Sequence, residues 1–182
     1  MKNKINRRDV IFLHPGDAVI TNKNKVIYTI LGSCVAITMH VPRLKIGAIV
    51  HCLLPEPGKA DNYECSNSEQ KYKYISCAIP LMTEFIQEFG IKLSEIEVKI
   101  FGGSNLLITK DEKQLSNSIG RKNIIVAENS LKEINLNIKA CDTGGNVGRK
   151  IYFFPSSGEV YLNRLKKADI TVEKFNTISA QL

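Results

Sequence analysis

Cys34 and His51 are the residue types that a thiol hydrolase needs, a nucleophile and a base. A cysteine thiol has a pKa of roughly 8.5 and is mostly protonated at neutral pH. An imidazole beside it can take the proton, which gives a thiolate paired with an imidazolium. The imidazolium can then protonate a departing amine, and the neutral imidazole can activate water. The pair therefore fits hydrolysis of an amide, provided that folding brings the two side chains together.

A β-hairpin is predicted to do this, with strands over residues 34–41 and 46–54. The first of these strands alternates in the period of a half-buried strand. A two-residue loop at Pro42-Arg43 places Cys34 directly opposite His51. A four-residue loop shifts the register by two positions and leaves them diagonal neighbours on one face. In either register we expect the thiol and the imidazole to meet within hydrogen-bond reach.

Glycines surround the thiol and recur in two later loops. The dipeptide Gly32-Ser33 precedes Cys34, so the backbone can turn sharply there and aim N–H groups at a substrate oxygen. Gly102-Gly103 lies in one glycine-rich loop, and residues 142–149 form another. Neither loop has the spacing of a phosphate-binding motif, and tight turns or bulges at sheet ends are the simpler interpretation. The alternative is a functional role, in which both loops form the backbone walls of a substrate cleft at Cys34. Backbone N–H groups of such a cleft could hold the oxyanion.

The remaining pattern predicts an α+β fold. Apolar residues recur at helical spacing over residues 66–90 and 117–134, and Ser66 with Glu69 has the spacing of a capping box. Runs rich in β-branched and aromatic residues predict further strands at residues 9–13, 25–31, 95–101, 135–142, 150–154 and 159–165. Frequent hairpins favour an α+β or layered α/β/β domain over a doubly wound parallel sheet. We expect a single domain over residues 1–165 and a tail over 166–182.

Composition excludes several other classes of protein. The chain has 182 residues, of which 43% are hydrophobic and 24% charged, as is ordinary for one globular domain. No apolar run approaches the roughly 18 residues of a membrane-spanning helix, and no secretory signal is evident. We therefore expect a cytoplasmic protein without membrane insertion. The net charge of +7 is dispersed, which fits a solubilising surface or an acidic protein partner, and we expect no nucleic-acid ligand.

The five cysteines form no recognisable framework. Their number is odd and they show no CxxC spacing, so neither a disulfide framework nor a zinc site is predicted. Cys65 falls in a polar loop, where it could oxidise if exposed. The pattern also leaves a simpler interpretation open, in which Cys34 is a small buried hydrophobe and His51 a structural histidine.

The sequence resembles one known family, the bacterial chemoreceptor glutamine deamidases called CheD. The resemblance runs approximately from Phe12 to Leu165. It rests on short blocks in the family's order: Leu31-Gly32-Ser33-Cys34-Val35, His51 with Leu54-Pro55, Phe101-Gly102-Gly103, Ile119-Gly120-Arg121-Lys122-Asn123, Asp142-Thr143-Gly144-Gly145, Gly148-Arg149-Lys150 and Ser157-Gly158-Glu159-Val160. The combination is specific, although no single block is.

This resemblance implies a three-layer α/β/β sandwich. It also implies hydrolysis of glutamine side chains on chemotaxis receptors to glutamate, with release of ammonia. Cys34 would be the nucleophile and His51 the general acid and base, without metal or organic cofactor. The family's third catalytic position is a threonine six residues before the cysteine, which is Tyr28 here, with Thr29 as its neighbour. Either Thr29 takes the role through a local bulge, or the orienting group differs. The implied partners are the helical cytoplasmic region of methyl-accepting receptors and a CheC-type phosphatase.

Two other functions fit the same residues. A non-catalytic adaptor would bind receptors or a phosphatase through its basic surface. Another thiol hydrolase, such as a peptidase or a transglutaminase, would use the Cys/His pair on a different substrate. The reaction products distinguish these alternatives.

Overall fold

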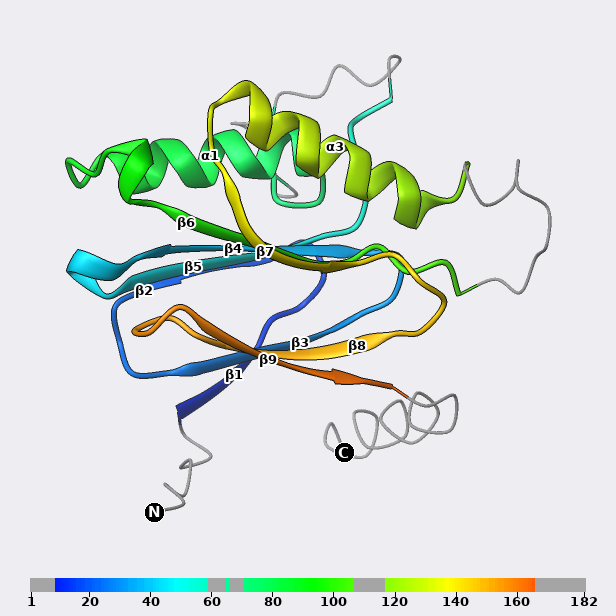
Figure 1. The fold of residues 1–182 in the computed structure, drawn as a ribbon, viewed down its shortest axis with the longest axis horizontal. Coiled ribbons are helices and arrows are strands. Elements are labelled where there is room, and N and C mark those ends of the chain that lie inside the picture. Colours follow the sequence, from blue (N-terminus) through cyan, green and yellow to red (C-terminus); the bar gives the residue numbers. More distant parts are fainter. Residues whose placement is uncertain (1–8, 59–64, 66–70, 107–116, 166–182) are drawn as a thin grey trace.

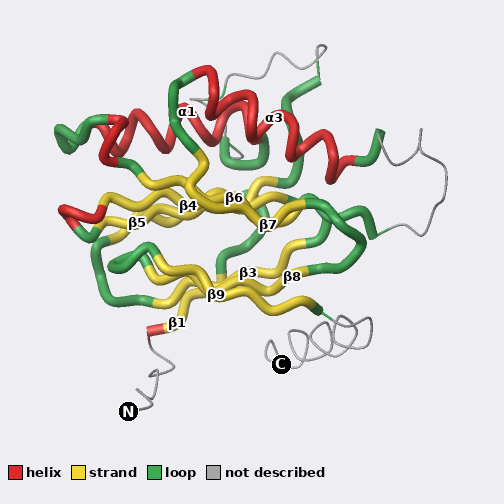
Figure 2. The backbone as a smooth tube through the Cα atoms, in the orientation of Figure 1, coloured by secondary structure: helices red, strands yellow, loops and turns green. Residues whose placement is uncertain are grey.

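The computed structural model places its described elements in three layers, a pair of α-helices, a five-stranded sheet and a four-stranded sheet (Figure 1). It describes residues 9–58, 65, 71–106 and 117–165. The helices cover one face of the five-stranded sheet, and the four-stranded sheet covers the other (Figure 2). The predicted α+β sandwich is therefore confirmed. The expected tail over 166–182 lies outside the described residues.

The five-stranded sheet holds the predicted hairpin at its centre. Its strands, in spatial order, are β2 (Ala18–Thr21), β5 (Ile46–Cys52), β4 (Val35–Val41), β6 (Glu97–Gly102) and β7 (Ile138–Thr143). Only β6 and β7 are parallel among these neighbours. Strand β4 is buried along its whole length because apolar layers cover it on both faces.

The four-stranded sheet supplies the second wall of the inter-sheet core. Its spatial order is β1 (Val10–Phe12), β3 (Val26–Leu31), β8 (Arg149–Phe154) and β9 (Glu159–Arg164). Strands β1 and β3 are parallel, and the other neighbours are antiparallel. Between the two sheets lies a compact apolar core made of Leu13, Ile27, Leu31, Ala36, Ile49, Phe101, Ile151 and Phe153. One end of this core carries Cys34, which packs against it.

Helices α1 (Ile75–Gln87) and α3 (Ile119–Glu133) bury one apolar stripe each against the five-stranded sheet. The second helix agrees with its prediction, and the Ser118 side chain caps it by accepting the N–H of Arg121. The first helix begins at Ile75, later than predicted, and the proposed capping box at Ser66 lies outside the described residues. No helix in the described part of the chain is long and apolar enough to cross a membrane.

Two sheet predictions need correction. Strand β2 was not predicted, because its four residues are too few to show alternation, and it forms an edge by pairing with β5. The two-residue hairpin loop is wrong. Val41 pairs with Ile46, and the intervening residues form a short 3₁₀ turn over Pro42–Leu44 followed by Lys45 at φ 52°. The four-residue alternative is therefore the observed one.

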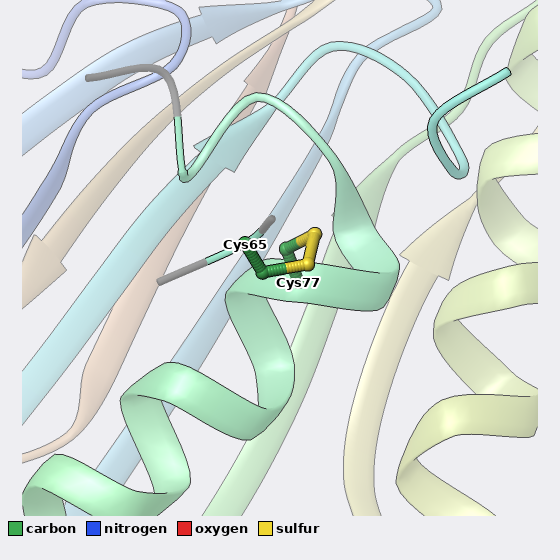
Figure 3. The surroundings of a disulfide bond; sticks show 2 residues. All are labelled: Cys65 and Cys77. Atoms are coloured by element: carbon green, nitrogen blue, oxygen red, sulfur yellow. A yellow bond between two sulfur atoms is a disulfide. The ribbon is translucent and has the colours of Figure 1, made fainter. Parts of the chain in front are cut away.

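A disulfide joins Cys65 to Cys77, contrary to the absence of a disulfide predicted from the cysteine pattern. Figure 3 shows the disulfide between Cys65 and Cys77, with Cys77 on the first turn of α1. The two Cα atoms are 5.3 Å apart across 12 residues of sequence. Such pairing depends on tertiary proximity, which spacing alone does not reveal.

Candidate active site

Cys34 and His51 lie on the same face of the five-stranded sheet. In the β4–β5 ladder His51 pairs with Ala36, whose side chain belongs to the core between the two sheets. Cys34 is two residues before Ala36 and packs against that same core. Cys34 immediately precedes β4, so the alternation of that strand, continued by one residue, makes Cys34 a diagonal neighbour of His51, with Cβ atoms about 7 Å apart in such pairs. The hairpin thus brings both residues to one face of the sheet, but no hydrogen bond joins the thiol to the imidazole.

The imidazole of His51 is oriented by Thr29. His51 is 1% exposed, and its Nδ1 lies 2.7 Å from Thr29 Oγ1. The Thr29 hydroxyl donates its only hydrogen to the carbonyl oxygen of Leu13 at 2.8 Å, so Oγ1 accepts from Nδ1–H. This fixes the tautomer and leaves the lone pair on Nε2. Nε2 is buried and forms no hydrogen bond with any described residue, which leaves it available as a base.

Thr29 reaches this position by ordinary strand alternation rather than by a bulge. Strand β3 pairs with β8 in continuous register, with Thr29 opposite Ile151. Thr29 is buried between the sheets, whereas Tyr28 points to the opposite face, where its ring stacks on Tyr152. The expected bulge is therefore wrong. Thr29 comes from the four-stranded sheet and His51 from the five-stranded one, so their hydrogen bond crosses between the layers.

Burial sets the protonation of the pair. Desolvation lowers the pKa of His51 from its usual 6.5 to about 4, and the nearby carbonyl of Leu13 opposes this only in part. Desolvation also raises the pKa of Cys34, although its own backbone N–H acts in the opposite direction. At neutral pH the thiol of Cys34 and the imidazole of His51 are therefore both neutral. The thiolate–imidazolium pair expected from the sequence is not the resting state.

The loop that carries Cys34 is held by its carbonyl groups. Three consecutive carbonyl oxygens each accept one hydrogen bond. The Gly32 oxygen accepts from the Ser104 N–H at 2.8 Å, and the Cys34 oxygen accepts from the Gly103 N–H at 2.7 Å. The Ser33 oxygen between them accepts from Asn123 Nδ2 at 2.9 Å. Because each peptide is planar and trans, the N–H that follows a fixed carbonyl points the opposite way. The N–H of Cys34 is thereby fixed, and it lies near its own sulfur. An N–H in this position can donate to an oxyanion that forms beside the sulfur.

The two glycines of the first loop lie directly against Cys34. Gly102 has φ 108°, and a Cβ there would collide with the Cys34 carbonyl oxygen. Gly103 has φ 67° and uses its N–H to hold that same oxygen. The expected oxyanion role of Gly103 is therefore not open to its N–H in this structure. Both glycines instead let the backbone of β6 approach closely enough to support the cysteine loop.

Arg149 joins the two glycine-rich loops, a role that the sequence pattern does not predict. It is 3% exposed, and its guanidinium pairs with Asp142. It also donates to Ser104 Oγ, to the Gly144 carbonyl at 2.7 Å and to the Gly102 carbonyl. A planar guanidinium with five N–H groups suits such a convergence of acceptors. Its position after Gly148 gave no indication of burial.

Arg149→Met is expected to lower the free energy of unfolding by about 3 kcal/mol, because it leaves a carboxylate and several carbonyls without their buried donor. Arg164 is the matched control, since it pairs with the same Asp142 but is 61% exposed at the side chain. Arg164→Met should cost less than about 1 kcal/mol. Urea unfolding of both variants measures the difference, and equal losses would contradict the role given to Arg149.

Thr29→Val should reduce kcat/KM by about 10- to 100-fold, because the isosteric valine leaves Nδ1–H of His51 buried without an acceptor. Thr29→Ser keeps the hydroxyl and should retain most activity. Steady-state ammonia release with a receptor fragment gives both values. Equal rates for the two variants would show that the hydroxyl does not orient His51.

Comparison with known proteins identifies the family. A family model described as CheD chemotactic sensory transduction matches residues 53–164, more than half of the chain. The chain belongs to the CheD family. The resemblance stated from the sequence blocks is thereby confirmed.

Individual CheD relatives extend over nearly the whole chain. The chain is 36% identical to a probable chemoreceptor glutamine deamidase CheD of Maridesulfovibrio salexigens, covering 89% of this chain and 96% of the relative. It is 33% identical to a probable chemoreceptor glutamine deamidase CheD 2 of Geobacter sulfurreducens, covering 87% and 92%. The chemoreceptor glutamine deamidase CheD of Thermotoga maritima is 29% identical, with 81% and 87% covered. These names describe the relatives as amide hydrolases that act on chemoreceptors.

Proposed function

We propose that this protein is a chemoreceptor glutamine deamidase that uses Cys34 as its nucleophile and His51 as its acid and base. The observation that carries the proposal is the state of His51, whose Nδ1 is held by Thr29 while Nε2 has no partner among the described residues. Cys34 immediately precedes β4 and packs against the same inter-sheet core as Ala36, the ladder partner of His51. The names of the CheD relatives support the choice of substrate.

The reaction begins when Cys34 Sγ attacks the carboxamide carbon of a glutamine side chain. His51 Nε2 takes the thiol proton as the C–S bond forms, and the N–H of Cys34 stabilises the oxyanion. The protonated His51 gives that proton to the amide nitrogen, the C–N bond breaks, and ammonia leaves a thioester behind. Water then attacks the thioester while Nε2 accepts its proton. The C–S bond breaks, glutamate is released, and His51 returns the proton to the thiol.

The partners in this proposal are macromolecules. The substrate is the helical cytoplasmic region of methyl-accepting chemotaxis receptors, and the regulatory partner is a CheC-type phosphatase. The net charge of +7 favours encounter with acidic receptor segments, because opposite charges raise association rates at low salt. The alternative is an adaptor that binds receptors or the phosphatase without chemistry. The neutral, oriented and unpartnered base nitrogen of His51 favours the enzyme.

Mass spectrometry of a receptor cytoplasmic fragment incubated with the protein tests the proposal. Deamidation adds about one mass unit to each modified glutamine and releases ammonia, as hydrolysis through a thioester requires. Chain cleavage would indicate a peptidase, and incorporation of an added amine would indicate a transglutaminase. A fragment that binds the protein and keeps its mass unchanged would contradict the proposed activity and favour the adaptor.

A further inference from the structure

The buried side chain of Asn123 connects the two strand ends that carry Cys34 and His51. Asn123 lies on α3 and is 0% exposed. Its Nδ2 donates to the carbonyl oxygens of Ser33 and Leu53, each at 2.9 Å. Ser33 immediately precedes Cys34, and Leu53 lies two residues after His51. The two hydrogens of a single amide group are thus shared between the nucleophile's loop and the end of the base's strand.

We propose that Asn123 is a positioning residue that sets the geometry between Cys34 and His51, an inference that rests on the proposed function. Its bond to the Ser33 carbonyl fixes the Ser33–Cys34 peptide and so aims the Cys34 N–H, the oxyanion donor of the mechanism. Its bond to Leu53 restrains the end of β5 just beyond His51. Asn123 touches no reacting atom, so it acts only through these two backbone segments.

The surroundings of the Asn123 side chain indicate that its two N–H donors are the reason for an amide at this position. Asn123 Oδ1 is buried and has no hydrogen-bond partner among the described residues. An unpaired buried acceptor is unfavourable, so packing alone would favour an apolar side chain such as leucine. An amide NH₂ group provides two N–H donors from one atom, whereas aspartate offers acceptors only. The unpaired oxygen is therefore explained if both donors are needed.

Helix α3 is held where Asn123 can make these contacts. Gly120 lies one turn earlier on the same side of the helix, and a Cβ on it would come within 2.6 Å of the Gly103 carbonyl oxygen and 2.7 Å of that of Ser104. The helix therefore lies in close contact with the backbone that supports the cysteine loop. The position of Asn123 is set by this contact as well as by its own hydrogen bonds.

Asn123→Leu and Asn123→Asp test the inference. Both remove the two donors and keep the number and branching of the side-chain heavy atoms, one without and one with a new charge. Asn123→Ser is a milder variant that retains one hydroxyl donor. Asn129→Asp is the matched control, because Asn129 lies on the same helix but is exposed. The rate of ammonia release from a receptor fragment is divided by the amount of folded enzyme. That amount is measured by circular dichroism and thiol titration, and the melting temperature of each variant is recorded.

We expect kcat to fall about 100-fold in Asn123→Leu and Asn123→Asp, as misplacement of reacting groups by roughly 1 Å does, while KM stays nearly constant. Asn123→Ser should be intermediate, and Asn129→Asp should match the wild type. A purely structural role would lower the melting temperature and leave kcat per folded enzyme unchanged, and that result would overturn the inference. Cys34→Ala is assayed in parallel to separate this inference from the proposed function. If Cys34→Ala remains active, the proposed function fails. If Cys34→Ala is inactive while the Asn123 variants are fully active, only the role of Asn123 is refuted.

Discussion

Replacement of Cys34 by alanine is expected to lower kcat by roughly four to six orders of magnitude, to the background rate of amide hydrolysis. The reason is that no thioester can form without the sulfur, and water at the same place lacks a comparable nucleophile. The fold should be retained, since Cys34 is only half-buried at the end of the inter-sheet core. Ammonia release and the mass of a receptor fragment measure the effect, and circular dichroism confirms folding.

Cys141→Ala is the matched control for this loss. Cys141 is also a free cysteine, but it lies exposed on β7. Its replacement should leave kcat and KM unchanged. Loss of activity in Cys141→Ala together with full activity in Cys34→Ala would place the nucleophile elsewhere and refute the account of the site.

His51→Gln is expected to reduce kcat by about 10²- to 10⁴-fold, the usual contribution of a general acid and base. Glutamine retains hydrogen-bonding capacity but cannot carry a proton between the thiol, the leaving ammonia and water. His14→Gln is the matched control because His14 is exposed and makes an edge contact with Phe12. Comparable losses in both variants would show that the effect does not come from the base assigned here.

The pH dependence of kcat/KM should carry the signature of the same residue. Burial holds the pKa of His51 at about 4, so Nε2 is free to accept a proton at every pH above that value. Activity should therefore persist as pH falls through 6.5 and be lost only as it falls through about 4. The contradicting result would be a wild-type kcat/KM that falls as pH drops through about 6.5, together with no such fall in His51→Gln. It would mean that His51 titrates like an exposed histidine.

The sequence predicted the parts of this site that depend on strand periodicity. Alternation over residues 34–41 placed Cys34 on one face, and the hairpin carried His51 to that face in either register. The same rule decides between Tyr28 and Thr29, because only one of two adjacent strand residues can face the inter-sheet core. The family spacing alone indicates Tyr28, and it leaves a bulge at Thr29 or a different orienting group as the two alternatives.

Features that depend on tertiary contacts could not be obtained in this way. The hairpin register depends on the left-handed conformation of Lys45, and the disulfide depends on the spatial proximity of Cys65 and Cys77. From the sequence alone, polar side chains such as Arg149 and Asn123 are expected to be exposed. The fold buries both of them against backbone carbonyls. The same folding lowers the pKa of the base and raises that of the thiol, which the residue types alone do not predict.

The most direct test of the central claim is to trap the thioester. The enzyme is mixed with a glutamine-containing receptor fragment, quenched with acid within the first turnover, digested and analysed by mass spectrometry. The account predicts an adduct on the peptide that contains Cys34, with the mass of the substrate less one ammonia, because attack by Sγ expels ammonia before water enters. A burst of ammonia equal to the amount of enzyme without an adduct on Cys34, or with the adduct on another residue, would contradict it.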